Sequence, residues 1–104
     1  MDAFAALADP TRREILELLG EGERDAGAIA ARFSISRPGI SRHLRVLREA
    51  DLVDVRVDAQ RRVYQLRAER LAEMDEWLSR YRRFWTHRLD ALDTEIRRSA
   101  RKGD

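Results

Sequence analysis

The sequence predicts a mostly α-helical protein with one β-hairpin and a long C-terminal helix. Three observations carry this prediction. Apolar residues recur at helical spacing over most of the first 50 residues. The period changes to two between residues 52 and 66, as in paired strands. From residue 68 to about residue 100 the chain contains no Pro or Gly, and helix-forming residues dominate. We therefore expect four helices, then a hairpin, then one long helix.

Helix start and stop signals define the N-terminal segments. Asp9 and Pro10 are a predicted N-cap and first helical residue, because an aspartate accepts from free N–H groups and a proline has no N–H to leave unpaired there. Gly20 and Gly22 end this helix, and Asp25 is the predicted cap of the next. The expected segments are a short apolar stretch over residues 2–7, a helix that begins after Asp9, and a helix over residues 26–33.

The next helix, over about residues 37–50, is predicted to be amphipathic and basic. Ser36 is its N-cap, and Pro38 lies in the first turn, where its missing N–H costs nothing. Ile40, Leu44 and Leu47 follow the i, i+4, i+7 spacing of a buried stripe. A step of about 100° per residue then gives an outward face that carries Arg37, Ser41, Arg42 and Arg45.

The net charge of +2 is small, but it is unevenly distributed. Residues 1–33 carry 4 basic and 7 acidic side chains, residues 34–67 carry 8 and 4, and residues 68–104 carry 9 and 8. Between Ser34 and Arg48 there are four arginines, one histidine and no acidic residue. An arginine-rich genome would produce a solvated basic face without any ligand. A local excess on one helix is better evidence for a nucleic acid partner than the net charge.

A two-residue alternation follows the basic helix and predicts one β-hairpin. Apolar residues from 52 to 57 alternate with charged ones, a second β-rich run covers residues 63–66, and the residues between them are turn-like. Gln60, Arg61 and Arg62 cluster at the tip. Charge at an exposed strand also discourages aggregation, which is the alternative interpretation of these arginines.

Two short helices joined by a brief turn, the second of them basic, form a helix-turn-helix pattern, and the hairpin supplies a wing. We expect one winged-helix DNA-binding domain over residues 1–104. Its predicted parts are a helix-turn-helix over about 26–50, a wing over about 53–67 and a C-terminal dimerisation helix over about 68–100. Arginine can pair with guanine O6 and N7 in the major groove, and serine hydroxyls can position phosphates. The predicted DNA contacts are Arg37, Ser41, Arg42 and Arg45 on the helix, with Arg61 and Arg62 on the wing.

The C-terminal segment predicts one long amphipathic helix with a wide apolar face. Large apolar residues recur there at spacings of three and four, from Leu71 to Ile96. A small domain cannot cover such a face alone, so we expect a second copy to pack on it in a C2 homodimer. The alternative is that the aromatic cluster forms one wall of a small-molecule pocket in a ligand-responsive regulator. The expected dimer interface comprises Phe4, Leu7, Trp77, Leu78, Tyr81, Phe84, Trp85, Leu89 and Leu92.

Three stretches of the sequence resemble the ArsR-type winged-helix repressors: FAALADPTRREILELL, ISRPGISRHLRVLREADLV and RRVYQL. The resemblance covers about residues 3–67, and the tail EWLSRYRRFWTHRLDAL looks like the branch of the family that does not sense metals. The resemblance implies a homodimer that binds a palindromic operator in double-stranded DNA and represses transcription. It places DNA contacts on Ser36, Arg37, Ser41 and Arg42, with wing contacts from Gln60 to Arg62.

Two positions depart from the family pattern. The family commonly has glycine where Ser34 stands, and it favours glycine where Asp51 stands. A glycine after the basic helix would adopt a left-handed conformation, which aspartate adopts at some cost. We therefore expect a slightly strained corner at Asp51 and no change of fold.

Composition narrows the other functions. The absence of cysteine excludes a disulfide framework, a thiolate metal site and a cysteine nucleophile. His87 and Asp90 from two subunits are the remaining metal-site candidates, and an exposed His–Asp pair on one helix is the simpler interpretation. His43 lies at the margin of the buried stripe, and Ser41, two positions away on the same helix, does not face it. We expect no metal, no cofactor and no enzyme activity.

Location and partners complete the expectations. No run approaches the roughly 18 apolar residues of a membrane span, and no apolar segment follows Met1. We therefore expect a cytoplasmic protein with no membrane partner. The alternative from a different functional class is a winged-helix adaptor whose aromatic helix binds another protein. The residues identify no small-molecule effector.

Overall fold

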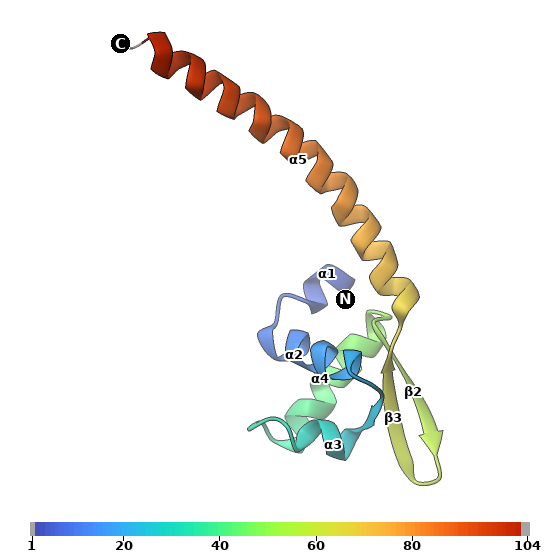
Figure 1. Cartoon of the computed structure of the whole chain (residues 1–104). Coiled ribbons are helices and arrows are strands. Elements are labelled where there is room, and N and C mark those ends of the chain that lie inside the picture. The colour runs from blue at the N-terminus through green and yellow to red at the C-terminus, as the bar shows by residue number, and fades with distance from the viewer. Residues whose placement is uncertain (1, 103–104) are drawn as a thin grey trace. The chain divides into compact units, whose positions relative to one another are not determined.

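The computed structural model describes residues 2–102 and confirms the expected fold class, mostly helical with one small antiparallel sheet (Figure 1). The two ends of the expected domain, residues 1 and 103–104, lie outside the described residues. The chain divides into two compact units with the boundary after Leu71. The elements are α1 (Ala3–Ala6), α2 (Pro10–Gly20), β1 (Arg24–Asp25), α3 (Ala26–Ala30), α4 (Arg37–Glu49), β2 (Val53–Asp58), β3 (Arg61–Leu66) and α5 (Ala68–Lys102).

The predicted caps are present at the helix starts. Asp9 Oδ1 accepts from Arg12 N at 3.1 Å, and Asp25 Oδ1 accepts from Ala28 N at 2.7 Å. Each cap pairs one of the N–H groups that a helix start leaves free. The helix after Asp25 is shorter than expected, because it ends at Ala30 and not at residue 33. The backbone tightens there into three-residue turns, with Arg32 N donating to Ile29 O at 3.0 Å.

The sheet contains the predicted hairpin and one strand that the sequence pattern did not reveal. Strands β2 and β3 pair in antiparallel register from Val53↔Leu66 to Asp58↔Arg61, which leaves a two-residue loop at the tip. The two-residue strand β1 pairs with the other edge of β3, giving the order β1-β3-β2. Because α3 starts directly after β1, this third strand ties the start of the helix-turn-helix to the wing.

The corner between α4 and β2 has the strained geometry expected at Asp51. Asp51 has φ 61°, in the left-handed region. Asp51 N donates to Arg48 O and Leu52 N donates to Leu47 O, both at 3.0 Å. These two bonds are the pattern of a Schellman helix end. Leu47 and Leu52 are both fully buried, so the motif also has its usual apolar contact pair.

The core of the first unit forms from one face of each element. Ile40, Leu44 and Leu47 are 0–1% exposed, which confirms the predicted stripe of α4. They share the core with Ile15 of α2 and Ile29 of α3. A helix fixed by three buried aliphatic side chains presents its opposite face to solvent in one defined orientation.

The second unit begins at Ala72, within the long helix α5, which runs continuously from Ala68 to Lys102. Its aromatic side chains form a ladder along the helix. Trp77 stacks on Tyr81 with ring centroids 5.3 Å apart, and Trp85 meets Tyr81 edge-on at 5.8 Å. Phe84 packs edge-on against Trp85 at 5.9 Å. The rings therefore form one continuous surface.

Candidate nucleic-acid interface

Helix α4 presents the predicted basic face to solvent. Arg37, Ser41, Arg42 and Arg45 are all exposed, while the opposite stripe is buried. Ser36 occupies the N-cap position, where its Oγ accepts from Gly39 N at 3.3 Å. The hydroxyl proton of a capping serine is still free to donate. The basic face therefore starts at a helix N-terminus where the N–H of Arg37 can also donate, whereas Pro38 has no N–H and those of Gly39 and Ile40 are bonded to Ser36.

Gly39 fixes how the turn before α4 approaches the helix. A Cβ atom at this position would lie 2.7 Å from Ile35 Cγ2 and 3.3 Å from Ser36 Oγ. The first distance is shorter than real Cβ contacts, so any larger residue would force the Ile35 side chain in the turn to shift. The glycine therefore lets the turn pack closely against the first turn of α4.

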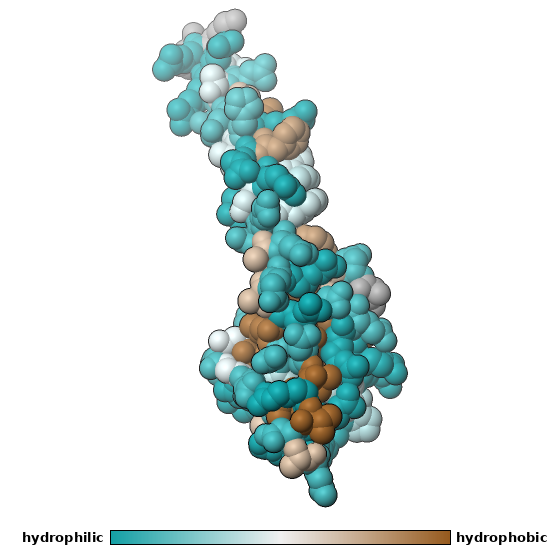
Figure 2. Space-filling model, turned by 90° about the vertical axis from the view of Figure 1, so that its right-hand side faces the viewer, coloured by the Kyte–Doolittle hydropathy of each residue, from teal (hydrophilic) through white to brown (hydrophobic). Residues whose placement is uncertain are grey.

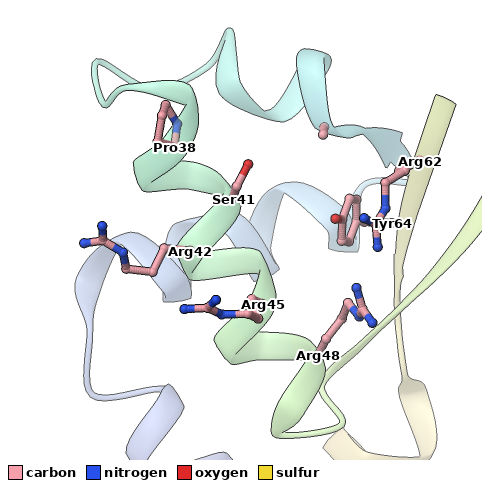
Figure 3. A pocket seen from close by; sticks show the side chains of 8 residues that line it. Pro38, Ser41, Arg42, Arg45, Arg48, Arg62 and Tyr64 are labelled. Carbon is pink, nitrogen blue, oxygen red and sulfur yellow. The ribbon is translucent and has the colours of Figure 1, made fainter. Parts of the chain in front are cut away.

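A hollow of about 550 Å³ separates α4 from the wing (Figure 3). The predicted contacts Ser41, Arg42 and Arg45 line it from the helix, and Arg62 lines it from β3. Four further lining residues were not among the predicted site residues: Ala26, Pro38, Arg48 and Tyr64. The structure thus brings four of the eight predicted contacts to one concave, basic surface.

A second hollow, of about 370 Å³, lies at the tip of the wing. It brings Arg37, from the first turn of α4, together with Gln60, Arg61 and Arg62. The N-terminal end of α3 forms the remaining wall. Seven of the eight predicted contacts therefore line one of the two hollows, and the eighth, Ser36, is the cap of α4.

Ion pairs divide the arginines of this region into two groups. Arg56 forms a bidentate pair with Glu23, both bonds 2.7 Å, and this bond holds the pKa of Glu23 below its ordinary value. Arg61 is held between two carboxylates, Asp25 at 3.3 Å and Asp58 at 3.2 Å. The arginines of α4 and β3 that have no carboxylate partner among residues 2–102 are Arg37, Arg42, Arg45, Arg48 and Arg62.

The ion pairs distinguish the two arginines of the predicted wing. Arg61 and Arg62 are adjacent in the sequence, and nothing in the sequence pattern separates them. In the structure Arg62 is unpaired and lines both hollows, whereas the charge of Arg61 is compensated by its neighbours. The unpaired arginines of α4 and β3 thus form a surface of uncompensated positive charge, which attracts a polyanion.

His43 lies beneath the basic face and not on it. The side chain is half-buried, and its Nδ1 is buried with no hydrogen-bond partner among the described residues. It contributes to the electrostatics of Asp9, the cap of α2. Burial acts to raise the pKa of Asp9, but the hydrogen bond from Arg12 N and the charge of His43 outweigh it, so that the pKa lies below its ordinary value.

The expected dimer residues are mostly exposed in the single chain. On α5 the seven predicted side chains are 41–58% exposed, and Ile96, which the prediction omitted, extends the apolar surface at 66%. Figure 2 shows brown and tan hydrophobic side chains at the surface of the helix among teal hydrophilic ones. Phe4 of α1 is 43% exposed, and Leu7 is half-buried.

Between residues 2 and 102 no group of three or more His, Asp or Glu side chains is arranged to hold a metal ion. Of the helices in this range, none combines the length and the apolar character needed to cross a membrane.

Comparisons with known proteins agree with this geometry. The family model described as a helix-turn-helix domain matches residues 7–56. The transcriptional repressor SdpR of Bacillus subtilis is 40% identical over 74% of this chain and 86% of its own length. The HTH-type transcriptional regulator Rv2034 of Mycobacterium tuberculosis is 46% identical over 84% of this chain and 78% of its own.

A solved structure extends the agreement to three dimensions. The ArsR-like transcriptional regulator from Rhodococcus sp. RHA1 superimposes with a TM-score of 0.73 at 35% sequence identity, covering 86% of this chain and 84% of the other. The fold, the basic helix with its wing and the sequence identity all agree. The chain belongs to the ArsR family of winged-helix, DNA-binding transcriptional regulators.

Proposed function

We propose that this protein is a homodimeric repressor that binds a palindromic operator by placing α4 in the major groove and the wing on the adjacent backbone. The observation that carries the proposal is the set of unpaired arginines on α4 and β3, four of which line one concave surface. Five arginines without carboxylate partners, held on a rigid helix and its wing, match the charge and the shape of duplex DNA. The proposal assigns no catalytic step and no cofactor to the chain.

The contacts divide by their position on the surface. Arg37, Arg42 and Arg45 read or clamp the edges of the major groove, where bidentate pairing with guanine gives sequence preference. Ser36 and Ser41 position phosphates through their hydroxyls. Gln60, Arg61 and Arg62 contact the backbone beside the neighbouring minor groove. Arg61 exchanges its carboxylate partners for phosphate when it binds, so its net contribution is smaller than that of Arg62.

The apolar face of α5 supports the proposed dimer. Large side chains that are 41–66% exposed continue along this face from Trp77 to Ile96. Exposed apolar surfaces of this extent mark interaction sites. A second copy is the simplest partner, because a two-fold axis pairs the face with itself and presents two α4 helices to two half-sites about 34 Å apart.

The DNA arm of the proposal is tested by retardation of upstream promoter fragments over a series of salt concentrations. Arg42→Ala should weaken binding by about 5–150-fold, equivalent to 1–3 kcal/mol, and relax preference at one base pair. Arg32→Ala is the matched control, because it removes the same charge from a surface lined by Glu14, Glu17 and Glu21. Equal affinities for wild type, Arg42→Ala and Arg32→Ala would refute the assignment of α4. No retardation at low salt would instead favour the protein-binding adaptor.

The dimer arm is tested by light scattering and sedimentation on purified protein. Trp85→Glu should raise the dimer dissociation constant by at least about thirtyfold, because it removes a large aromatic anchor and places a charge in the contact. His87→Glu adds the same charge to the exposed opposite face of α5 and should leave the dimer intact. A monomeric wild type, or equal effects of the two variants, would contradict a dimer built on this face.

A further inference from the structure

We infer that the hollow between the end of α4 and β3 is a binding site for one backbone phosphate of the DNA, held by Arg48, Arg62 and Tyr64. The inference deepens the proposed function and rests on it. It adds two residues, Arg48 and Tyr64, to the contacts that sequence reasoning named. It also gives the space between helix and wing a role of its own, separate from base reading by the exposed face of α4.

Arg48 extends in a different direction from the other arginines of α4. Figure 3 shows Arg42 and Arg45 extending from α4 away from the wing, whereas Arg48 extends towards Arg62 and Tyr64. Arg48 lies in the last turn of α4, and the other two residues lie on β3. The three side chains therefore line the same hollow from two different elements.

The hollow carries uncompensated positive charge. The residues that line it include four arginines and no Asp or Glu. Neither Arg48 nor Arg62 has a carboxylate partner among residues 2–102. Two guanidinium groups that face one space repel each other unless an anion lies between them, and a phosphodiester oxygen accepts from both.

The hydroxyl of Tyr64 provides a further hydrogen-bond donor. The residue is only 6% exposed, and it lines the hollow. The hydroxyl has no hydrogen-bond partner among residues 2–102 and is not cut off from solvent, so it is free to donate into the hollow. A hydroxyl donor beside two guanidinium groups completes a set of donors for one phosphate. The set reads no base, because phosphate contacts carry no direct sequence information.

The position of the hollow identifies the DNA backbone as the source of the phosphate. When α4 occupies a major groove and the wing touches the next minor groove, the strand between the two grooves passes between helix and wing. The hollow lies at that place and is open to solvent. A phosphate of this strand is therefore the expected occupant, in preference to a free anion.

The test measures affinity for a selected operator and for random duplex DNA as a function of salt. Arg48→Ala should weaken binding to both by the same factor, about tenfold or more, and lower the salt slope by about 0.9. Arg48→Lys should keep the slope and recover only part of the affinity, because it keeps the charge but loses the fork. Tyr64→Phe should weaken both about two- to tenfold with no change in slope. Arg32→Ala is again the matched control.

A second arm localises the contact on the DNA. A single methylphosphonate, placed at successive positions of the operator, removes one phosphate charge at a time. Wild type should lose affinity at one position in each half-site, and Arg48→Ala should show no further loss at that position. Circular dichroism and thermal melting of each variant verify that it is folded.

The outcomes separate the two proposals. If wild type binds no DNA, both the proposed function and the phosphate site are refuted. If wild type binds but Arg48→Ala matches Arg32→Ala, only the phosphate site is refuted. A loss confined to one base pair of the operator would make Arg48 a base reader and contradict the inference. Saturation of the hollow by micromolar inorganic phosphate alone, observed by NMR, would assign it to a free anion.

Discussion

Replacing Asp51 by glycine should stabilise the protein, because the corner between α4 and β2 needs a left-handed residue. Asp51 adopts φ 61° with a Cβ atom present. A left-handed conformation costs a residue with a side chain about 1–2 kcal/mol, and aspartate is among those that tolerate it best. Glycine adopts it freely, so Asp51→Gly keeps the Schellman bonds and removes the strain.

Two effects reduce the expected gain. Glycine has more freedom in the unfolded chain, which costs about 0.5–1 kcal/mol. The substitution also removes the ion pair from Arg67 to Asp51, which is 3.4 Å long and largely exposed. Such a pair contributes about 0–0.5 kcal/mol. The net stabilisation of Asp51→Gly should be about 0.5 kcal/mol, which raises the melting temperature of a domain of this size by about 2–4 °C.

Urea denaturation and thermal melting measure the effect. Asp51→Ala is the informative control, because it loses the same ion pair but keeps a Cβ atom in the left-handed region. The free energy of unfolding of Asp51→Gly should exceed that of Asp51→Ala by at least about 1 kcal/mol. Equal stabilities of the two variants would show that the corner is not strained and would refute the reasoning. Operator affinity should stay within about twofold of wild type, because residue 51 faces neither hollow.

Three further variants test other parts of the structure. Asp58→Asn releases Arg61 from one of its two carboxylates and should tighten DNA binding about two- to fivefold at low salt; weaker binding in a retardation assay would contradict the compensated pair. Gly39→Ala should destabilise the wild-type protein but stabilise an Ile35→Ala background, since the clash at 2.7 Å is with Ile35; a denaturation cycle with additive effects would rule out this contact. The pKa of Asp9 lies below its ordinary value. The ionised carboxylate therefore stabilises the fold fully at any pH above the ordinary pKa, and this stabilisation is lost as the pH falls through the lowered pKa. Asp9→Asn keeps the cap and should flatten the acid side of the stability curve, and an unchanged curve would contradict this role.

The helices and the wing could be predicted because each has a local signal. The caps at Asp9 and Asp25 and the stripe from Ile40 to Leu47 depend only on neighbouring residues, and the structure contains all of them. The left-handed Asp51 was expected from the family pattern and has that conformation. The strand β1 could not be predicted, because a strand of two residues has no period and exists only through its pairing with β3.

The candidate site was predictable in outline but not in its ion pairs. Helical phase placed Arg42 and Arg45 on the exposed face, and the local charge excess included Arg48. Helical phase identified only the residues opposite the buried stripe. The side of α4 that lies towards the wing was therefore not among the predicted contacts. The difference between Arg61 and Arg62 arises from Asp25, which is 36 positions away from Arg61 in the sequence. Contacts over such separations follow from the fold and not from any local pattern.

Selection of bound duplexes from a random DNA pool tests the central claim most directly, because it reports sequence preference, symmetry and spacing together. The account predicts an inverted repeat whose half-sites are centred about 10 base pairs apart, one helical turn. Selection with Arg42→Ala should return the same repeat with one position relaxed in each half-site. No enrichment by wild type, or an identical motif from Arg42→Ala, would contradict the claim that α4 reads the operator.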